Sequence, residues 1–199
     1  RFFKTFGNPS GALRSIIRPE GAFGVAQGKG SVVDWSRKLY NELKAGGVRL
    51  CTSLPDSWIR GLIAQLHEES DMIHVPVARE EEAVGICCGA SAGGMRAAMV
   101  IQNVGAMNCA GALATLPIAY GIPFVMILSH RGRLGDWAFY DIEKGRSTVP
   151  ILEQVGIQCF PLPADFVERG CVADAYTLAD ASQKPVALLI TKETFGADE

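Results

Sequence analysis

The sequence has 199 residues, of which 48% are hydrophobic and 20% charged, and its formal net charge is −2. This composition is typical of a compact folded protein and excludes a disordered or low-complexity chain. The small charge and the absence of a dense Lys/Arg run exclude a nucleic-acid-binding surface. No apolar stretch approaches the roughly 20 residues that a membrane-spanning helix needs.

Cysteine and histidine are placed in a way that argues against metal binding. The cysteines form no CxxC pair, and most lie in apolar or Ala/Gly-rich segments, at Cys51, Cys87, Cys88, Cys109, Cys159 and Cys171. Reduced, buried thiols are typical of cytoplasmic proteins, so we expect a cytoplasmic localisation. The three histidines do not cluster with these cysteines, and we expect no metal site in this chain.

Residues 1–30 show no sustained periodicity, and we expect an N-terminal extension before one domain of residues 31–199. Within that domain, helical and strand patterns alternate, with a polar loop expected over 130–146. The expected helices cover 32–43, 56–66 with Asp56 as its cap, a segment opened by Glu80, 107–120, 150–155 and 164–182. The expected strands cover 48–54, 72–77, 97–102, 123–129, 157–161 and 185–191.

This alternation predicts an α/β fold with three layers, in which helices cover both faces of a mostly parallel central sheet. The near-continuous apolar runs of the strands fit a sheet that is buried on both sides. In such sheets, ligands bind beyond the carboxyl ends of the strands. Three segments follow strands in this way: 53–55, 79–80 and 102–108.

Glu80 begins a helix of small residues directly after a buried strand, in the segment VPVAREEEAVGICCGASAGG. Small side chains at this point allow another group to approach closely. The simpler interpretation is that Glu80, Glu81 and Glu82 only complement the positive end of the helix dipole.

A second polar turn follows the next strand, in the segment AAMVIQNVGAMNCAGAL. Amide side chains offer neutral donors and acceptors that suit a heteroaromatic ligand. The alternative is an ordinary turn in which one side chain caps the following helix.

The alternating pattern by itself also fits a flavodoxin-like nucleotide-binding domain. Such a domain needs a phosphate-binding loop after its first strand, and SLPDSW, with its proline and tryptophan, is a poor candidate. The sequence contains neither GxxxxGK[ST] nor GxGxxG after a strand.

Taken together and in order, REEEAVGICCG and IQNVGAMNCAGAL resemble the pyrimidine-binding domain of thiamine-diphosphate-dependent enzymes. The similarity is greatest to the alpha subunits of sulfopyruvate decarboxylases and to phosphonopyruvate decarboxylases. SLPDSW, SHRGRLGDW and EKGRSTVPILEQVGI also match, so that the resemblance extends over residues 31–195. It implies the thiamine-diphosphate-binding fold.

The resemblance implies that Glu80 is the catalytic glutamate, which hydrogen-bonds the aminopyrimidine of thiamine diphosphate and so activates the cofactor. It also implies that Asn103, Gly105 and Asn108 lie against the cofactor. This chain departs from the family pattern at Val104, where serine is common.

The residues expected on the substrate side are Ser53, Leu54 and Pro55, again through the resemblance. His130 and Arg131 follow another strand, and a guanidinium suits a sulfonate or phosphonate because it offers several parallel donors. The alternative for Arg131 is an ion pair at the surface or between subunits.

Thiamine-diphosphate enzymes bind the diphosphate through Mg²⁺ on a second domain marked by a GDG sequence, which this chain lacks. The resemblance therefore implies a beta subunit that carries this domain, in a hetero-oligomer whose cofactor lies between the two chains. We expect the alpha-like chain alone to be inactive.

The reaction implied is the decarboxylation of a 2-oxo acid, with 3-sulfopyruvate giving sulfoacetaldehyde and CO₂. Phosphonopyruvate, pyruvate or another 2-oxo acid is an alternative substrate. Two further alternatives are an acetolactate-synthase-like carboligase and a non-catalytic binding subunit of the same fold.

Overall fold

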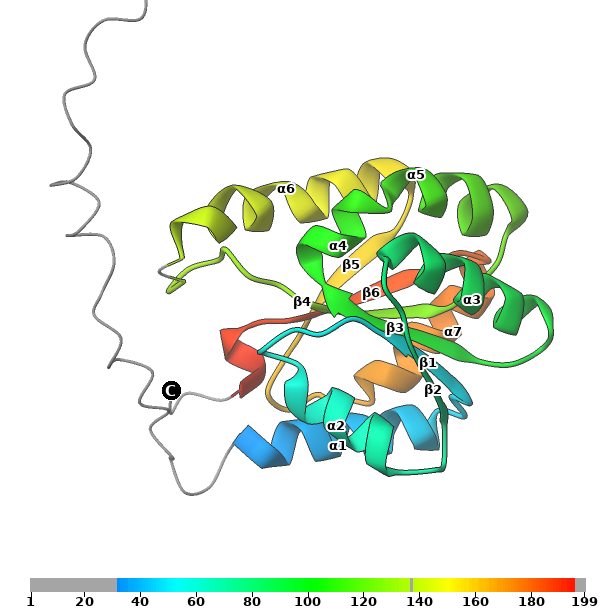
Figure 1. Cartoon of the computed structure of the whole chain (residues 1–199), viewed down its shortest axis with the longest axis horizontal. Coiled ribbons are helices and arrows are strands. Elements are labelled where there is room, and N and C mark those ends of the chain that lie inside the picture. Colours follow the sequence, from blue (N-terminus) through cyan, green and yellow to red (C-terminus); the bar gives the residue numbers. More distant parts are fainter. Residues whose placement is uncertain (1–31, 137, 196–199) are drawn as a thin grey trace, which may run out of the picture.

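A computed structural model describes residues 32–136 and 138–195, so the extension expected over 1–30 lies outside the described residues. The described part forms a six-stranded, all-parallel sheet with the strand order β2-β1-β3-β4-β6-β5 (Figure 1). The strands are β1 Leu50–Ser53, β2 Ile73–Pro76, β3 Ala97–Gln102, β4 Val125–Ser129, β5 Gln158–Leu162 and β6 Val186–Ile190. The predicted α/β class with a parallel sheet is confirmed.

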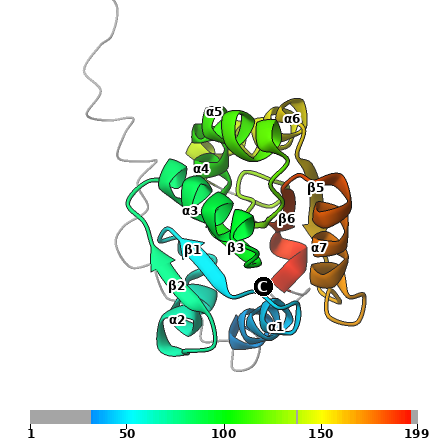
Figure 2. The ribbon, with the colours of Figure 1, turned by 90° about the vertical axis from the view of Figure 1, so that its right-hand side faces the viewer.

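Helices cover both faces of this sheet (Figure 2). The helices α1 (Val32–Ala45), α2 (Arg60–Glu68) and α7 (Cys171–Ser182) pack on one face. The other face is covered by α3 (Glu80–Ala92), α4 (Asn103–Asn108), α5 (Ala110–Leu113), the π-helical turn η2 (Ala114–Ile118) and α6 (Phe139–Val155). A short 3₁₀ helix, η3, covers Lys192–Phe195.

The central strands are buried on both sides, as their apolar sequences predict. Along β3, Ala98 and Val100 belong to the core under α1, α2 and α7, whereas Met99 and Ile101 belong to the core under α3 to α6. Successive side chains of a strand point to opposite faces, so a strand between two helical layers needs apolar residues at every position.

Four of the expected elements differ in the structure. The helix expected over 164–182 begins only at Cys171. The loop expected over 130–146 ends early, because α6 begins at Phe139. The helix expected over 107–120 begins at Asn103 and continues as three short segments, with Pro117 inside the π-helical turn. Asp56 does not cap α2, which begins at Arg60; its carboxylate instead accepts a hydrogen bond from the Trp58 backbone N–H at 2.9 Å.

Because the strands are parallel, their carboxyl ends share one edge of the sheet. β1 lies between β2 and β3, with Ser53 paired to Pro76 on one side and to Val100 on the other. The loop after β1, the start of α3 and the start of α4 therefore meet at this edge, where ligands bind in sheets of this type.

Candidate active site

The three consecutive glutamates at the start of α3 have different environments. The Glu82 carboxylate accepts hydrogen bonds from the backbone N–H groups of Ala78 at 3.0 Å and Arg79 at 3.3 Å, which caps the helix. Glu81 lies 3.6 Å from the Arg79 guanidinium in an exposed ion pair. All three carboxylates lie in the first turn of α3, where they complement the helix dipole, but Glu82 alone caps the helix, and the Glu80 carboxyl has no capping role.

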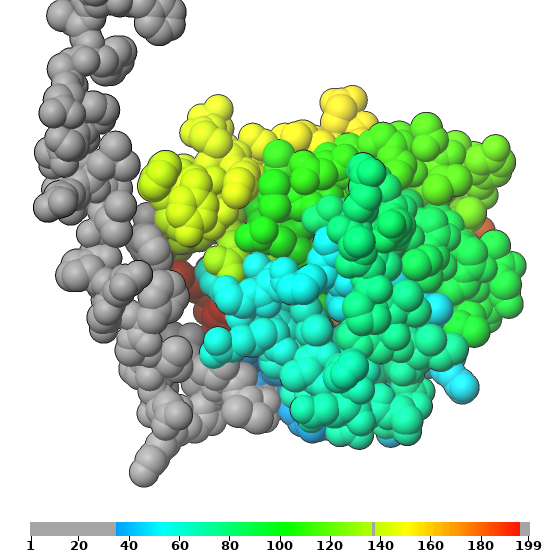
Figure 3. Space-filling model, viewed as in Figure 1, coloured from blue at the N-terminus to red at the C-terminus, as the bar shows by residue number. Residues whose placement is uncertain are grey.

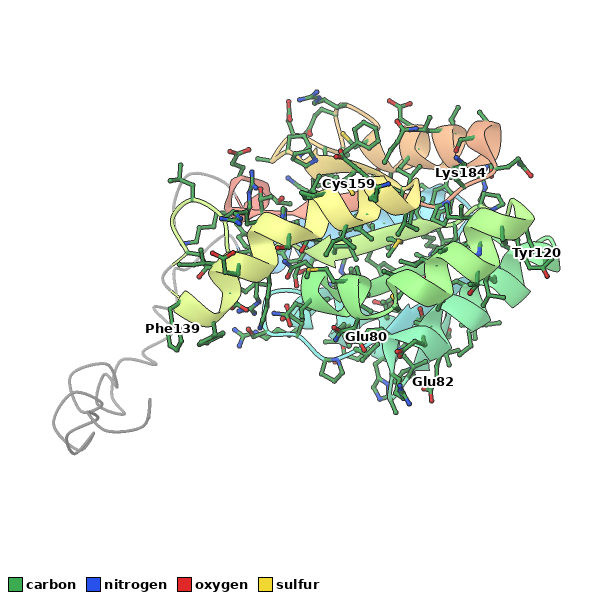
Figure 4. The ribbon with its side chains drawn as sticks, turned by 90° about the horizontal axis from the view of Figure 1, so that it is seen from above. Glu80, Glu82, Tyr120, Phe139, Cys159 and Lys184 are labelled. Atoms are coloured by element: carbon green, nitrogen blue, oxygen red, sulfur yellow. The ribbon has the colours of Figure 1, made fainter. Side chains whose placement is uncertain are left out.

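The Glu80 side chain, labelled in Figure 4, points toward α4. There it is in direct contact with Gly105. A Cβ atom built on Gly105 would lie 2.8 Å from the Glu80 carboxyl carbon, closer than real Cβ contacts. Gly105 is thus the residue that leaves room for the carboxyl group. The structure brings these two predicted site residues together at the carboxyl edge of the sheet.

The thiol of Cys109 belongs to the wall of this site. Burial, and secondarily the charges of Glu80 and Glu81, raise the pKa of Cys109 to about 12. Its Sγ donates a hydrogen bond to the Ala106 carbonyl at 3.4 Å. A thiol in this state is neutral at physiological pH and does not act as a nucleophile.

The two asparagines expected beside the cofactor are placed differently. Asn103 is fully buried, and its amide nitrogen donates to Thr148 Oγ1 at 3.0 Å and to the Arg131 carbonyl at 3.3 Å. Its Oδ1 is buried without a hydrogen-bond partner among the described residues. Asn108 is exposed at the end of α4. Asn103 therefore joins α4 to α6, and Asn108 is the more accessible of the two.

The residues expected on the substrate side follow β1. Ser53 is buried and shares a 2.8 Å hydrogen bond with His74 Nε2, whereas Leu54 is half-buried and Pro55 exposed. Burial, and secondarily the charge of His67, lower the pKa of His74, which keeps its ring neutral at neutral pH.

An open pocket of about 610 Å³ lies beside the carboxyl ends of β1 and β2. Ser53 and Pro55 line it, and Leu54 does not. Its other lining residues are Asp56, Ser57, Arg60, Ile63, Ala64, His67, His74 and Pro76.

Arg131 is held in a cluster of charged side chains. Its guanidinium is paired with Asp56 at 3.1 Å, donates to Ser57 Oγ at 2.6 Å and lies over the Trp58 ring, 5.0 Å from the ring centroid. Its side chain is 15% exposed. The predicted cation is therefore present at this edge, and its nearest partners, Asp56 and Ser57, belong to the loop after β1.

His130 is buried, and its Nε2 lies 3.0 Å from the Gly145 carbonyl in α6. Burial lowers the pKa of His130, against the opposing effect of this hydrogen bond. The neutral ring thus connects the end of β4 to α6.

Several residues of this region were not predicted from the sequence. Asp141 lies 4.0 Å from Arg131 and 3.1 Å from Lys144, and Thr148 accepts from Asn103. All three belong to the part of the chain expected as loop or left unassigned. Their one local signal is the spacing of Asp141 and Lys144, which places opposite charges three residues apart on a helix.

None of the helices in residues 32–136 and 138–195 has the length and apolar character required of a membrane span. All six cysteines are free thiols, and four of them are buried.

Comparison with solved structures supports the fold assignment. The chain is similar to a 2-oxoglutarate:ferredoxin oxidoreductase from Magnetococcus marinus, solved with 2-oxoglutarate, coenzyme A and succinyl-CoA bound. The TM-score is 0.61 and the identity 15%, over 81% of this chain and 29% of the other. The shared architecture is a thiamine-diphosphate-type fold.

Comparison with curated proteins identifies the family, although no family model matches the chain. The sulfopyruvate decarboxylase subunit alpha of Methanococcus maripaludis is 34% identical over 78% of this chain and 93% of its own length. The corresponding subunit of Methanothermobacter thermautotrophicus is 33% identical over 79% and 96%. A sulfopyruvate decarboxylase of Methanosarcina acetivorans is 30% identical over 63% of this chain and 32% of its own length. The chain therefore belongs to the family of sulfopyruvate decarboxylase alpha subunits.

Proposed function

We propose that this chain is the alpha subunit of a thiamine-diphosphate-dependent decarboxylase that acts on 3-sulfopyruvate. The observation that carries the proposal is the packing of Glu80 on Gly105 at the carboxyl edge of the sheet, in a chain of this family. Such an edge is where a parallel α/β sheet binds its ligand. The free thiols support a cytoplasmic localisation.

The residues at this edge fit the pyrimidine half of the cofactor. Glu80 has no capping role and no ion-pair partner among the described residues, so its carboxyl group is available to hydrogen-bond a ring nitrogen. The cofactor supplies the nucleophile and electron sink for loss of CO₂. Glu80 would share a proton with the pyrimidine ring, and Gly105, which has no side chain, leaves the space that the carboxyl group occupies.

The diphosphate and its Mg²⁺ are assigned to a beta subunit. The sequence has no GDG motif, and among residues 32–136 and 138–195 no group of His, Cys, Asp and Glu side chains could hold a metal ion. Three relatives carry the name subunit alpha. The Methanosarcina acetivorans relative matches this chain over about a third of its length, which leaves room for a second domain in the same polypeptide.

The proposed reaction breaks the bond between the carboxylate carbon and the keto carbon of 3-sulfopyruvate. The carboxylate leaves as CO₂, and a proton replaces it on the former keto carbon, which gives sulfoacetaldehyde. Arg131 is the cation placed to recognise the sulfonate, because a guanidinium offers parallel donors to its oxygens. Asp56 and Ser57 are the present partners of the Arg131 guanidinium. To bind the sulfonate in this way, Arg131 exchanges these partners for the substrate.

The test is an assay with thiamine diphosphate and Mg²⁺, with and without the GDG-containing subunit encoded beside this chain. Sulfopyruvate, phosphonopyruvate and pyruvate are compared, and any aldehyde is trapped by reduction. We expect sulfoacetaldehyde only when both subunits are present. A longer carbon product would indicate carboligation. The absence of product from every acid would favour a non-catalytic subunit.

A further inference from the structure

Four large apolar side chains are exposed around the loop between β4 and α6. Leu134 is 99% exposed, Phe139 72%, Tyr140 55% and Ile142 47%. We call these residues the β4–α6 patch. They are half of the large hydrophobic side chains that are exposed among the described residues, although they come from a short stretch of chain. Exposed apolar side chains grouped in this way mark interaction surfaces.

The patch lies at the same edge of the sheet as the candidate active site. Its residues follow the carboxyl end of β4, and α6 packs against α4, which carries Gly105. In the space-filling view, the yellow-green residues of this region protrude at the upper left of the molecule (Figure 3). Phe139 and Tyr120 lie at opposite ends of the domain (Figure 4).

Hydrogen bonds join the described residues of the loop that presents the patch to one another and to Lys192. The Asp136 carboxylate accepts hydrogen bonds from the backbone N–H groups of Gly132 at 2.8 Å and Ala138 at 3.2 Å. Lys192 donates to the Gly135 carbonyl. The Phe139 and Tyr140 rings stack edge to face, with centroids 5.4 Å apart.

We infer that the β4–α6 patch is the surface on which the beta subunit docks. This inference rests on the proposed function, in which a second chain completes the cofactor site. A subunit that binds the diphosphate beside Glu80 and Gly105 has to cover this edge of the sheet. The patch adjoins the edge, because α6, which carries most of the patch, packs against α4, which carries Gly105.

The relatives favour this occupant over a second copy of the chain. Three are named subunit alpha, and a fourth matches this chain over about a third of a longer polypeptide. The partner surface is expected to be apolar, because aromatic and aliphatic anchors in the centre of an interface contribute most of its binding energy.

The experiment measures association of the full chain with the GDG-containing subunit by sedimentation velocity, without substrate. The test variant is Leu134→Ser/Phe139→Ser, which spares Tyr140 and its contact with Lys144. The matched control is Tyr120→Ser, because Tyr120 is 75% exposed and lies at the other end of the domain. Circular dichroism and thermal unfolding verify that all three chains are folded.

We expect the double variant to bind the partner at least tenfold more weakly and the control to bind like the wild type. Equal binding by the double variant overturns the inference, as does a wild-type chain that uses the patch only to self-associate. Because aldehyde formation is not the readout, the two proposals fail separately. If the double variant binds the partner normally in a complex that forms aldehyde, the patch is not the docking surface. If association depends on the patch but the complex forms no aldehyde, the proposed decarboxylase activity is wrong.

Discussion

Gly105 is in contact with the carboxyl group of Glu80, and the absence of a side chain at residue 105 is what permits this contact. Glu80 starts α3 and Gly105 is the third residue of α4, on the same face of the sheet. α4 follows the buried strand β3, whereas α3 follows β2, which was expected to be buried but is a partly exposed strand at the edge of the sheet. The position of the Glu80 carboxyl group therefore depends on Gly105, which has no side chain that could take part in the reaction.

Gly105→Ala should lower the activity of the assembled enzyme about 10- to 100-fold, because the new methyl group displaces the Glu80 carboxyl. Steady-state kinetics with the partner present measure this loss. Gly111→Ala is the control, since a Cβ at Gly111 meets nothing within 4 Å. The double variant Gly105→Ala/Glu80→Gln should be no less active than Glu80→Gln alone, because the two substitutions disturb the same interaction. Additive losses would contradict this coupling.

Arg131→Met should destabilise the fold by about 2–4 kcal/mol, because it leaves the buried carboxylates of Asp56 and Asp141 without this cation. Urea unfolding followed by circular dichroism provides the measurement. Arg37→Met is the matched control. The Arg37–Glu69 pair is 2.8 Å long but well exposed, so its loss should cost less than about 1 kcal/mol. Equal losses in the two variants would show that the Arg131 cluster contributes no more than a surface ion pair.

The free energy of unfolding should fall as the pH drops below about 6.5. Burial lowers the pKa of His130 in the folded state below its usual value of 6.5, so the unfolded chain binds the proton more readily. The contribution of the neutral ring is present above pH 6.5 and is lost as the pH falls through the folded-state pKa.

Urea midpoints at about pH 7.5 and about pH 5.5 test this effect of His130. Between these two pH values, the variant His130→Asn should lose less free energy of unfolding than the wild type. His74, whose pKa burial also lowers, keeps part of the dependence in both proteins. An unchanged loss in His130→Asn would exclude His130 as a source of the pH dependence.

The sequence predicted the sheet and the edge at which the site lies, because both depend on local signals. Apolar runs located the six strands, and the position of Glu80 directly after β2 located the start of α3. The first half of α6 was not predicted. Gly145 has poor helix propensity, and its place in the helix is set by contact with the backbone of Arg131 and Gly132. This contact joins Gly145 to residues more than one helical turn away in the sequence, so the local pattern of apolar residues does not reveal it.

The role of individual site residues was harder to predict for the same reason. Asn103 and Asn108 look equivalent in the sequence, but one is fully buried against Thr148 and the other is exposed. For Arg131 the sequence left open a substrate-binding cation and an ion pair, and it could not name Asp56 as the partner, because their pairing arises only when the ends of β1 and β4 share an edge. The roles of the predicted cofactor and substrate residues stay predictions.

The most direct test of the account is proton exchange at C2 of thiamine diphosphate in the assembled complex, followed by NMR after acid quench. The comparison is between the wild type, Glu80→Gln and the control Glu81→Gln, whose ion pair is exposed. We predict rapid exchange in the wild type and in Glu81→Gln, and exchange slowed about 10²- to 10⁴-fold in Glu80→Gln. Wild-type exchange in a folded, assembled Glu80→Gln complex would contradict the assignment of Glu80 as the residue that activates the cofactor.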